Sequence, residues 1–252
     1  MKSKPLISII LTYYKKKPFL KKTLKSISDQ SFKNYELIFV YDDDDKHELN
    51  FVKQSLKRFN KKKILINKKN MGVAKSRNIA LKHSKGLYFA FIDADDIWKK
   101  DKLLKQLNFM KKNAYNFSFT SYSSIDVKGK IIKHRNVSFD ADYKNLYKSN
   151  FIGLSTVMIN KKILPLFKFP NLRTQEDFAL WLKLTRRGVE LKHLKYNLSF
   201  WRKTKNSLSS NIHQKFSDAF KLYYFYEKKN FIFSIYSVIV LSYNKILNNY
   251  FK

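Results

Sequence analysis

Acidic side chains are scarce in this chain, and two groups of them follow apolar segments that are typical of strands. One group is Asp42–Asp45 and the other is Asp93–Asp96, in which position 94 is alanine. Because residues i and i+2 of an extended chain point the same way, Asp93 and Asp95 are expected to face one ligand. Carboxylate oxygens suit Mg²⁺ or Mn²⁺, whose coordination a diphosphate and water can complete. Solvated loops with helix-capping acids are the alternative, but the position after a buried strand favours a site.

A third acidic group, Thr174-Gln175-Glu176-Asp177, precedes an amphipathic segment. One interpretation is a capping box, with Thr174 as the N-cap and acids in the first turn that complement the helix dipole. A carboxylate at a helix start can also act as a general base when it reaches an acceptor hydroxyl. The sequence by itself favours the cap, and Glu176 and Asp177 can divide the two roles.

The segment Asn70-Met71-Gly72 opens a basic helical region that contains Arg77. It is either a glycine-assisted helix start with exposed basic residues or the place where Arg77 holds a nucleotide or phosphate. No glycine-rich Rossmann or Walker motif is present, which argues against those cofactor sites. The 5 histidines lie in different segments without metal-binding spacing. Serines that lack a nucleophile-elbow context are expected to form a loop, namely Ser207, Ser209 and Ser210.

Short apolar runs alternate with longer amphipathic runs along the first half of the chain. Strands are expected at 6–11, 36–41, 63–66 and 87–92, and helices at 20–30, 47–59, 72–83 and 103–110. This order predicts a largely parallel sheet covered by helices on both faces. Ligands of such sheets bind at the carboxyl ends of the strands.

The second half is less regular. Strands are expected at 117–122, 131–136 and 157–159, a helix after Thr174, and helical structure from His213 onward. The uncharged run Phe231–Tyr243 is shorter than the roughly 20 residues that a spanning helix needs.

Composition limits the classes of function. Lys and Arg number 52 against 19 Asp and Glu, a net charge of +33 that attracts polyanions such as nucleic acid or anionic lipid. Lysine is scattered through every segment, so a biased genome composition explains the charge equally well. The absence of cysteine excludes disulfides, thiolate metal sites and cysteine nucleophiles. The apolar run at 6–11 is too short for a signal-peptide core, and the protein is therefore predicted to be unexported.

Several segments follow one another in an order that resembles glycosyltransferase family 2. They are Ile7–Tyr14, Ser26–Phe32, Tyr35–Asp43, Asn70–Gly72, Ser76–Asn78 and Asp93–Trp98. The likeness is dense over about the first 110 residues and resumes at Gln175–Asp177 with Trp181, and at Trp201-Arg202 with Asn206–Asn211. The pattern is similar to bacterial enzymes that build teichuronic acid, capsule or O-antigen polysaccharide.

The resemblance implies the A-type glycosyltransferase fold, an α/β fold whose mainly parallel sheet is flanked by helices, here with a helical C-terminal appendage. It implies an inverting transfer of sugar from a nucleotide diphosphate, with Mn²⁺ or Mg²⁺ as cofactor. Residues 1–211 would be the catalytic domain, with a nucleotide-sugar-binding half at 1–112 and an acceptor-binding half at 113–211. Residues 212–252 would be a helical tail.

The resemblance also implies roles for single residues. Asp177 would be the catalytic base, and Asp95 would hold the metal. Glu176, Trp201 and Arg202 would contact the acceptor or the departing diphosphate. The nucleotide sugar would contact Thr12, Tyr14, Asp42, Asp43, Asn70, Arg77, Asp93 and Asp95.

Two departures from the family pattern lie near the nucleotide. The usual Pro-Thr-Tyr-Asn appears as Leu11–Tyr14, and the usual Asp-Asp-Gly-Ser appears as Tyr41–Asp44. The second departure leaves open whether Asp42 or Asp43 meets the base.

The expected partners follow from the same resemblance. A UDP-sugar donor and a saccharide or lipid-linked acceptor are expected, with the enzyme in the cytoplasm and peripheral at the inner face of the cell membrane. The tail, with Phe216, Phe220, Tyr223, Tyr224 and Phe231–Tyr243 between lysines, suits an anionic membrane surface. The alternative is that it packs on the domain or joins two copies in a homo-oligomer.

Two other functions compete with sugar transfer. A basic nucleic-acid-binding protein would stack bases on aromatic side chains, but most aromatics fall in expected core segments, so nucleic acid is not an expected partner. A nucleotidyltransferase would also use paired acids and a metal, but it normally brings a glycine-rich loop, and residues 12–18 contain no glycine.

Overall fold

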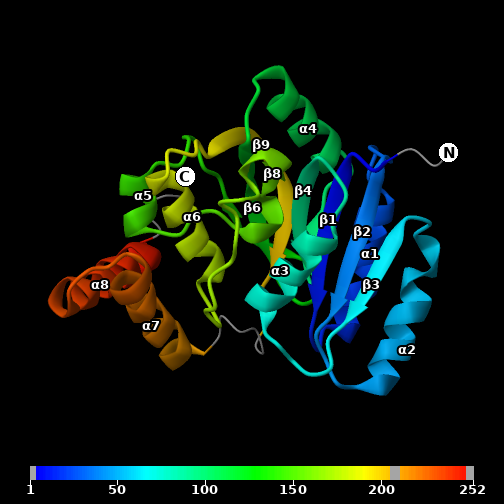
Figure 1. Cartoon of the computed structure of the whole chain (residues 1–252), viewed down its shortest axis with the longest axis horizontal. Helices are drawn as coiled ribbons and strands as arrows, with labels where there is room; N and C mark the ends of the chain where they lie inside the picture. The colour runs from blue at the N-terminus through cyan, green and yellow to red at the C-terminus, as the bar shows by residue number, and fades with distance from the viewer. Residues whose placement is uncertain (1–3, 205–210, 248–252) are drawn as a thin grey trace.

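The computed structural model describes residues 4–204 and 211–247. Over these residues, one sheet runs through the molecule in the order β3-β2-β1-β4-β8-β6-β9-β5, and β7 pairs with β6 (Figure 1). The sheet continues past residue 112, so the two expected halves share it. The calls on Ser207, Ser209 and Ser210, and on the segment 206–210, lie outside the described residues.

The first half of the sheet is parallel, as the alternation of elements predicts. The strands are β1 (Ile7–Tyr13), β2 (Tyr35–Tyr41), β3 (Lys62–Ile66) and β4 (Tyr88–Asp93), joined through α1 (Lys17–Ser28), α2 (Lys46–Ser55), a 3₁₀ turn (Leu56–Arg58) and α3 (Val73–His83). β1, in the middle, is buried at every position, because helices cover both of its faces.

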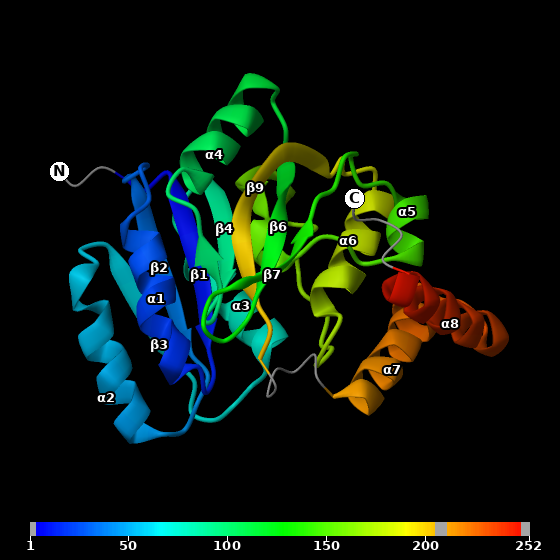
Figure 2. The same cartoon turned by 180° about the vertical axis from the view of Figure 1, so that it is seen from behind.

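Two apolar clusters divide the faces of the sheet. α1, α2 and α4 (Lys102–Lys112) pack on one face, which looks toward the viewer in Figure 2. α3 and α6 (Glu176–Arg186) pack on the other face, seen in Figure 1. Successive strand residues therefore contribute to opposite clusters, as Ile9 and Ile10 do.

The second half of the sheet is mixed. β8 (Met158–Asn160) runs antiparallel to both β4 and β6 (Phe117–Ile125), and β7 (Ile131–Arg135) forms a hairpin with β6. The long strand β9 (Lys192–Arg202) lies parallel to β6 and antiparallel to the short strand β5 (Ile97–Trp98). The sequence analysis missed β9, because register shifts beside Thr120–Tyr122 interrupt the alternation that identifies strands. Short 3₁₀ turns lie at Leu154–Thr156 and Lys161–Ile163.

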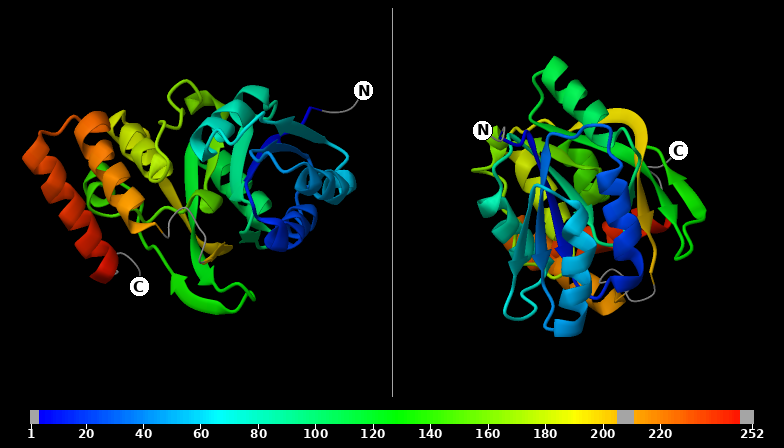
Figure 3. Two further views of the ribbon diagram at one scale, coloured as in Figure 1. Left: turned by 90° about the horizontal axis from the view of Figure 1, so that it is seen from below. Right: turned by 90° about the vertical axis from the view of Figure 1, so that its right-hand side faces the viewer.

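The C-terminal appendage consists of α7 (Ile212–Lys221), a π-helical turn (Leu222–Tyr226) and α8 (Phe231–Leu247). It packs beside α5 (Tyr143–Lys148) and α6, at the opposite end of the molecule from α2 (Figure 1). Figure 3 shows α8 as the outermost element at that end. Over the described residues, no helix combines the length and apolar character needed to span a membrane.

Candidate active site

The carboxyl ends of β1, β2 and β4 meet at one edge of the sheet. Thr12 pairs with Val40 of β2 on one side and with Asp93 of β4 on the other. The backbone N–H of Asp42 donates to the carbonyl of Tyr13 at 2.9 Å, which extends the pairing by one residue. Thr12, Asp42 and Asp93, which the resemblance assigns to the nucleotide, therefore lie at this edge.

Asp42 organises the loop that leads into α3. Its Oδ1 accepts from Asn67 Nδ2 at 2.7 Å and from the N–H of Met71 at 2.7 Å, and its Oδ2 accepts from the N–H of Gly72 at 3.0 Å. Asn70 donates to the Asp42 carbonyl at 3.2 Å. Gly72 takes a φ of 87°, a left-handed conformation that suits glycine. This hydrogen bonding brings Asn70 to the same edge of the sheet.

Asp43 and Tyr14 lie beside this loop. Asp43 is buried and accepts from the N–H groups of Lys15 and Asp44, at 3.1 and 2.9 Å. Tyr14 is exposed, and the Lys15 ammonium lies 5.2 Å from the centre of its ring. Asp42 and Asp43 thus both bond within the protein, and Tyr14 presents an open aromatic surface beside them.

The acidic group Asp93–Asp96 is a turn and not an extended segment. β4 ends at Asp93, and the N–H of Asp96 donates back to the carbonyl of Asp93 at 3.0 Å. Strand alternation is therefore the wrong reason to expect Asp93 and Asp95 to face one ligand, since alternation holds only in extended chain; that the two carboxylates share a ligand stays a prediction. Their carboxylates instead pair with different cations, Asp93 with Arg77 and Asp95 with Lys16.

Asp96 supports the turn from within. Its Oδ2 accepts from Ser155 Oγ at 2.5 Å, and its Oδ1 accepts from the N–H of Arg202 at 2.9 Å. Burial raises the pKa of Asp96 well above the usual carboxyl range. The Arg202 side chain donates to the Asp95 carbonyl at 2.9 Å and to the Asp126 carbonyl at 2.7 Å. Asp96 and Arg202 therefore fix the acidic turn against the end of β9.

Arg202 keeps one nitrogen available. Its Nη2 is buried and has no hydrogen-bond partner among residues 4–204 and 211–247, and its guanidinium lies 5.0 Å from the centre of the Phe19 ring. Trp201, its neighbour in β9, is partly buried and pairs with Ser124 of β6. Both residues lie at the end of β9, a strand that the sequence analysis did not predict.

Asp95 forms an ion pair with Lys16, the residue before α1. The distance between Lys16 Nζ and Asp95 Oδ2 is 2.6 Å, and both side chains are largely buried. Lys16 Nζ also donates to Thr204 Oγ1 at 3.3 Å, beyond the end of β9. Burial raises the pKa of Asp95, and the nearby ammonium opposes that shift. The carboxylate therefore already holds a cation, which is the chemistry a metal ligand requires.

Arg77 joins the two halves of the site. Its Nη2 lies 2.7 Å from Asp93 Oδ1, and its Nη1 lies 2.5 Å from Glu176 Oε1. The guanidinium is buried and lies 5.4 Å from the centre of the Phe169 ring. A donor-side carboxylate at the end of β4 and a carboxylate at the start of α6 are thus held by one fixed fork.

Asp177 follows Glu176 in the first turn of α6. Its Oδ1 accepts from the N–H of Phe178 at 2.6 Å. Burial, together with the charge of Glu176, raises the pKa of Asp177 to about 7, against the opposing effect of Arg77. A carboxyl group with this pKa can take up a proton near neutral pH.

The prediction that Thr174 caps α6 is wrong. The N-cap position belongs to Gln175, which has a left-handed φ of 64° and makes no capping bond with its side chain. The N–H and Oγ1 of Thr174 both donate to Asp218 Oδ2 in α7, at 2.8 and 2.9 Å. The start of the helix that carries Asp177 is therefore tied to the C-terminal appendage.

Sequence reasoning missed Lys16, Ser155 and Asp218 as parts of this arrangement. The only signal for Lys16 was its place in the basic run that follows β1. Ser155 and Asp218 bond to residues 59 and 44 positions away, and no local pattern marks such pairs. Among the described residues, no group of three or more His, Asp or Glu side chains gathers in a way that could hold a metal ion, at this edge or at any other place.

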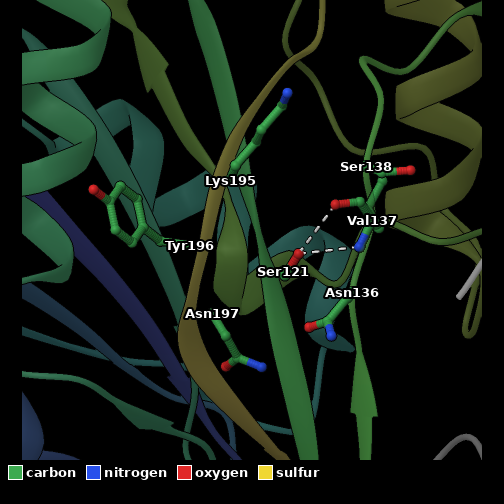
Figure 4. Close-up of a pocket in the computed structure, with 7 residues that line it drawn as sticks. All are labelled: Ser121, Asn136, Val137, Ser138, Lys195, Tyr196 and Asn197. Carbon is green, nitrogen blue, oxygen red and sulfur yellow. Dashed lines mark hydrogen bonds between the residues drawn. The ribbon is translucent and has the colours of Figure 1, made fainter. Parts of the chain in front are cut away.

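A polar cavity of about 220 Å³ lies away from these residues, beside the register shift of β9 (Figure 4). Ser121 Oγ accepts there from the N–H of Val137 at 3.0 Å. None of the candidate site residues lines it; its lining consists of Ser121, Asn136, Val137, Ser138, Lys195, Tyr196 and Asn197. We assign the chemistry to the carboxyl edge of β1, β2 and β4.

The sheet order and the acidic turn after β4 define a protein with the A-type glycosyltransferase fold. The glycosyltransferase TarS of Staphylococcus aureus, solved in complex with UDP-GlcNAc, superposes with a TM-score of 0.74 over 92% of this chain and 70% of that chain, at 18% identity. The mannosyltransferase PcManGT of Pyrobaculum calidifontis, solved with GDP-Man and Mn²⁺, gives a TM-score of 0.69 over 97% and 76%, at 12% identity.

Sequence comparison identifies the family. The profile of Glycosyl transferase family 2 matches residues 8–170, and the chain belongs to that family. TuaG of Bacillus subtilis, whose name assigns it to teichuronic acid biosynthesis, is 35% identical over 89% of this chain and 88% of its own length. The Escherichia coli glucosyltransferase WfgD is 32% identical over 82% of this chain and 80% of its own length. The protein is a glycosyltransferase, as its sequence motifs indicate.

Proposed function

We propose that the protein transfers a sugar, with inversion, from a nucleotide diphosphate to a hydroxyl group of a growing surface polysaccharide. The observation that carries the proposal is Asp177, a carboxyl group with a pKa of about 7 at the start of α6. Its neighbour Glu176 is joined through Arg77 to Asp93 at the donor edge. A base for the acceptor and a carboxylate for the donor thus belong to one connected network.

The donor side would use the carboxyl edge of the sheet. Thr12, Asp42 or Asp43, and Asn70 would contact the nucleoside, and the open ring of Tyr14 would lie against it. Arg77 would act on the donor through Asp93, because its two terminal nitrogens already bond to carboxylates. The free Nη2 of Arg202 would serve the departing diphosphate, with Trp201 and Glu176 near the acceptor. A uridine nucleotide is the expected donor, as in the TarS complex with UDP-GlcNAc.

Mn²⁺ or Mg²⁺ fits Asp95. A single buried carboxylate that already binds an ammonium at 2.6 Å suits a cation that takes one or two protein oxygens and completes its shell with diphosphate. When bound, the ion would stabilise the negative charge that develops on the leaving diphosphate. Lys16, displaced from Asp95, would remain near that charge as a second cation.

The chemistry is one displacement at the anomeric carbon. The acceptor oxygen forms the new bond on the face opposite the nucleotide, the bond to the diphosphate oxygen breaks, and that oxygen keeps the electron pair. Asp177 accepts the hydroxyl proton as the bond forms. The transition state has oxocarbenium character, and no covalent enzyme intermediate is needed.

Asp177→Asn tests the proposal. It should lower sugar transfer by about 10²–10⁴-fold, since a general base contributes that much. In the unchanged protein, transfer should rise as pH increases through about 7, because Asp177 acts only when it is ionised, and the variant should lose that rise. Rates would be measured with UDP-sugars and Mn²⁺ between pH 5.5 and 8.5.

Glu190→Gln is the matched control, because Glu190 is an exposed acid away from the site. It should keep both the rate and the pH profile. If a folded Asp177→Asn variant kept full transfer activity, Asp177 would not be the catalytic base. If the folded, unchanged protein transferred no sugar, the proposed function would be wrong.

We further propose that the acceptor is lipid-linked and that the enzyme works in the cytoplasm, peripheral to the inner face of the membrane. The relative WfgD is named as a UDP-Glc:α-D-GlcNAc-diphosphoundecaprenol β-1,3-glucosyltransferase, whose acceptor carries a lipid. A water-exposed site can reach such an acceptor when the enzyme rests on the bilayer surface. Transfer to a diphosphoundecaprenol-linked sugar, compared with the free sugar, tests this choice.

A further inference from the structure

The outward face of α8 is apolar. Ile232, Tyr236, Ile239, Tyr243 and Ile246 recur at helical spacing, and each is at least 59% exposed. The buried positions of the same helix are Ser234, Ser237, Val238 and Leu241. A surface helix normally turns its apolar stripe toward the core and its polar residues outward. α8 places two serines inward and a row of isoleucines and tyrosines outward.

The inward serines are hydrogen-bonded, and one of their bonds ties α8 to the domain. Ser237 Oγ lies 2.7 Å from the hydroxyl of Tyr147 in α5, and Ser234 Oγ donates to the Asn230 carbonyl at 2.8 Å. The sequence analysis placed Tyr223 with the residues of the expected membrane surface. In the structure it is buried, and its hydroxyl donates to the Tyr147 carbonyl at 2.7 Å. The tail thus packs on the domain with one side and leaves the other uncovered.

The uncovered surface continues beyond α8 through aromatic contacts. The ring of Phe231 packs edge-on against Phe220, at 5.5 Å between centroids, and Phe220 stacks on Tyr224 at the same distance. Tyr224 in turn meets Phe225, which is 64% exposed. Aromatic and aliphatic groups therefore form one surface from the π-helical turn to the end of α8.

The exposed charges of the described C-terminal appendage are of one sign. Asp218 and Glu227 are the only acids of the described residues 211–247, and both are buried. Asp218 bonds to Thr174, and Glu227 bonds to Tyr143 and Arg186. The exposed charged side chains there are lysines, namely Lys221, Lys228, Lys229 and Lys245.

We propose that the outer face of α8, together with Phe225 and Phe231, docks on an anionic lipid bilayer. Isoleucine and aromatic side chains would enter the boundary between headgroups and acyl chains, and the lysines would meet anionic headgroups. If the ligand were a soluble polyanion such as nucleic acid, the exposed row of isoleucines on α8 would have no role in binding it. A second copy of the chain would bring two appendages whose exposed charges are all positive close together, which opposes association. A bilayer satisfies both the apolar and the charged features.

Docking would also orient the enzyme. Asp218 of α7 holds Thr174, three positions before Asp177, so the docked appendage is bonded to the start of the catalytic helix. This step rests on the proposed function, because it places the candidate base relative to a lipid-linked acceptor. The docking itself needs no sugar transfer.

Vesicle flotation of the full chain tests the surface. The unchanged protein should float with vesicles of 70% phosphatidylcholine and 30% phosphatidylglycerol in 0.15 M salt. The double variant Ile232→Glu/Ile239→Glu should lose at least about tenfold in partition, because two carboxylates would enter the interface. Vesicles of pure phosphatidylcholine should bind the unchanged protein less, because the lysines lose their counter-charge.

The matched control is Ile131→Glu/Ile132→Glu, which changes two exposed isoleucines of β7 in the same way. It should float like the unchanged protein. Circular dichroism shows whether each variant is folded. UDP-sugar hydrolysis shows whether a variant that no longer floats is still catalytically active.

Three results would overturn the proposal. The first is that both double variants float equally well, and the second is that the unchanged protein does not float. The third is that the unchanged protein does not bind vesicles but forms a dimer in solution, which Ile232→Glu/Ile239→Glu dissociates. The last result would assign the surface to a second copy.

Discussion

The carboxyl edge of β1, β2 and β4, the candidate active site, and the outer face of α8 both depart from the usual distribution of residues, in opposite ways. At the edge, Arg77, Asp95, Asp96 and Glu176 are charged and buried; on α8, the apolar Ile232 and Ile246 are each 77% exposed. Charged groups are rarely buried unless they are paired, and each of these four residues has a partner inside the chain. The apolar face of α8 has no cover within the described residues. The four charged residues at the edge are paired within the chain, whereas the apolar face of α8 needs a partner from outside the chain.

The largest expected effect comes from removing the fork at the edge. Arg77→Met should lower the free energy of unfolding by about 3 kcal/mol, because it leaves the buried Glu176 without its counter-charge and also removes the partner of the partly exposed Asp93. Urea denaturation followed by circular dichroism measures this.

A second variant isolates the cause. Adding Asp93→Asn and Glu176→Gln to Arg77→Met should recover part of the lost stability, since the unpaired charges disappear. Lys25→Met, which removes an exposed ion pair with Asp29, should leave the free energy of unfolding almost unchanged, because solvent screens such a pair. An effect of Arg77→Met as small as that of Lys25→Met would show that the edge does not depend on its internal pairing.

A smaller effect is expected at Lys16. Lys16→Met should tighten Mn²⁺ binding by the nucleotide-free protein about fivefold to tenfold, because the metal then no longer competes with an ammonium 2.6 Å from Asp95. Isothermal titration calorimetry with MnCl₂ gives the affinity without any turnover. Lys25→Met should leave the affinity unchanged, and Asp95→Asn should abolish binding. Weaker Mn²⁺ binding by Lys16→Met would mean that the lysine helps to build the site.

The donor half was largely predictable from the sequence, and for a physical reason. β1, β2 and β4 are buried on both faces, so their segments are continuous apolar runs between clear breaks. The acids that follow them had to meet at the carboxyl edge once the sheet was parallel. Fold class and the neighbourhood of Thr12, Asp42 and Asp93 therefore followed from local pattern.

The remaining features depend on contacts that no local pattern encodes. The pairing of Arg77 with Glu176 joins residues 99 positions apart. The direction of the Asp93 and Asp95 carboxylates depends on a turn where alternation predicted extended chain. The sequence did not predict β9, because its buried and exposed positions do not alternate evenly. In α8, composition predicted a surface helix, but an inward face built on Ser234 and Ser237 is the opposite of what amphipathicity predicts.

The smallest expected effect tests whether the outer face of α8 contributes to folding at all. Ile239→Ala should change the free energy of unfolding by no more than about 0.5 kcal/mol, because Ile239 is 59% exposed and alanine favours helix. Leu241→Ala, two positions along and buried, should cost about 2 kcal/mol or more. Urea denaturation of both full-length variants without lipid measures the difference. A loss in Ile239→Ala equal to that in Leu241→Ala would mean that the chain itself covers this face. Near-zero loss, together with reduced flotation, would mean that the isoleucine is retained for the bilayer, since it adds nothing to the folded protein alone.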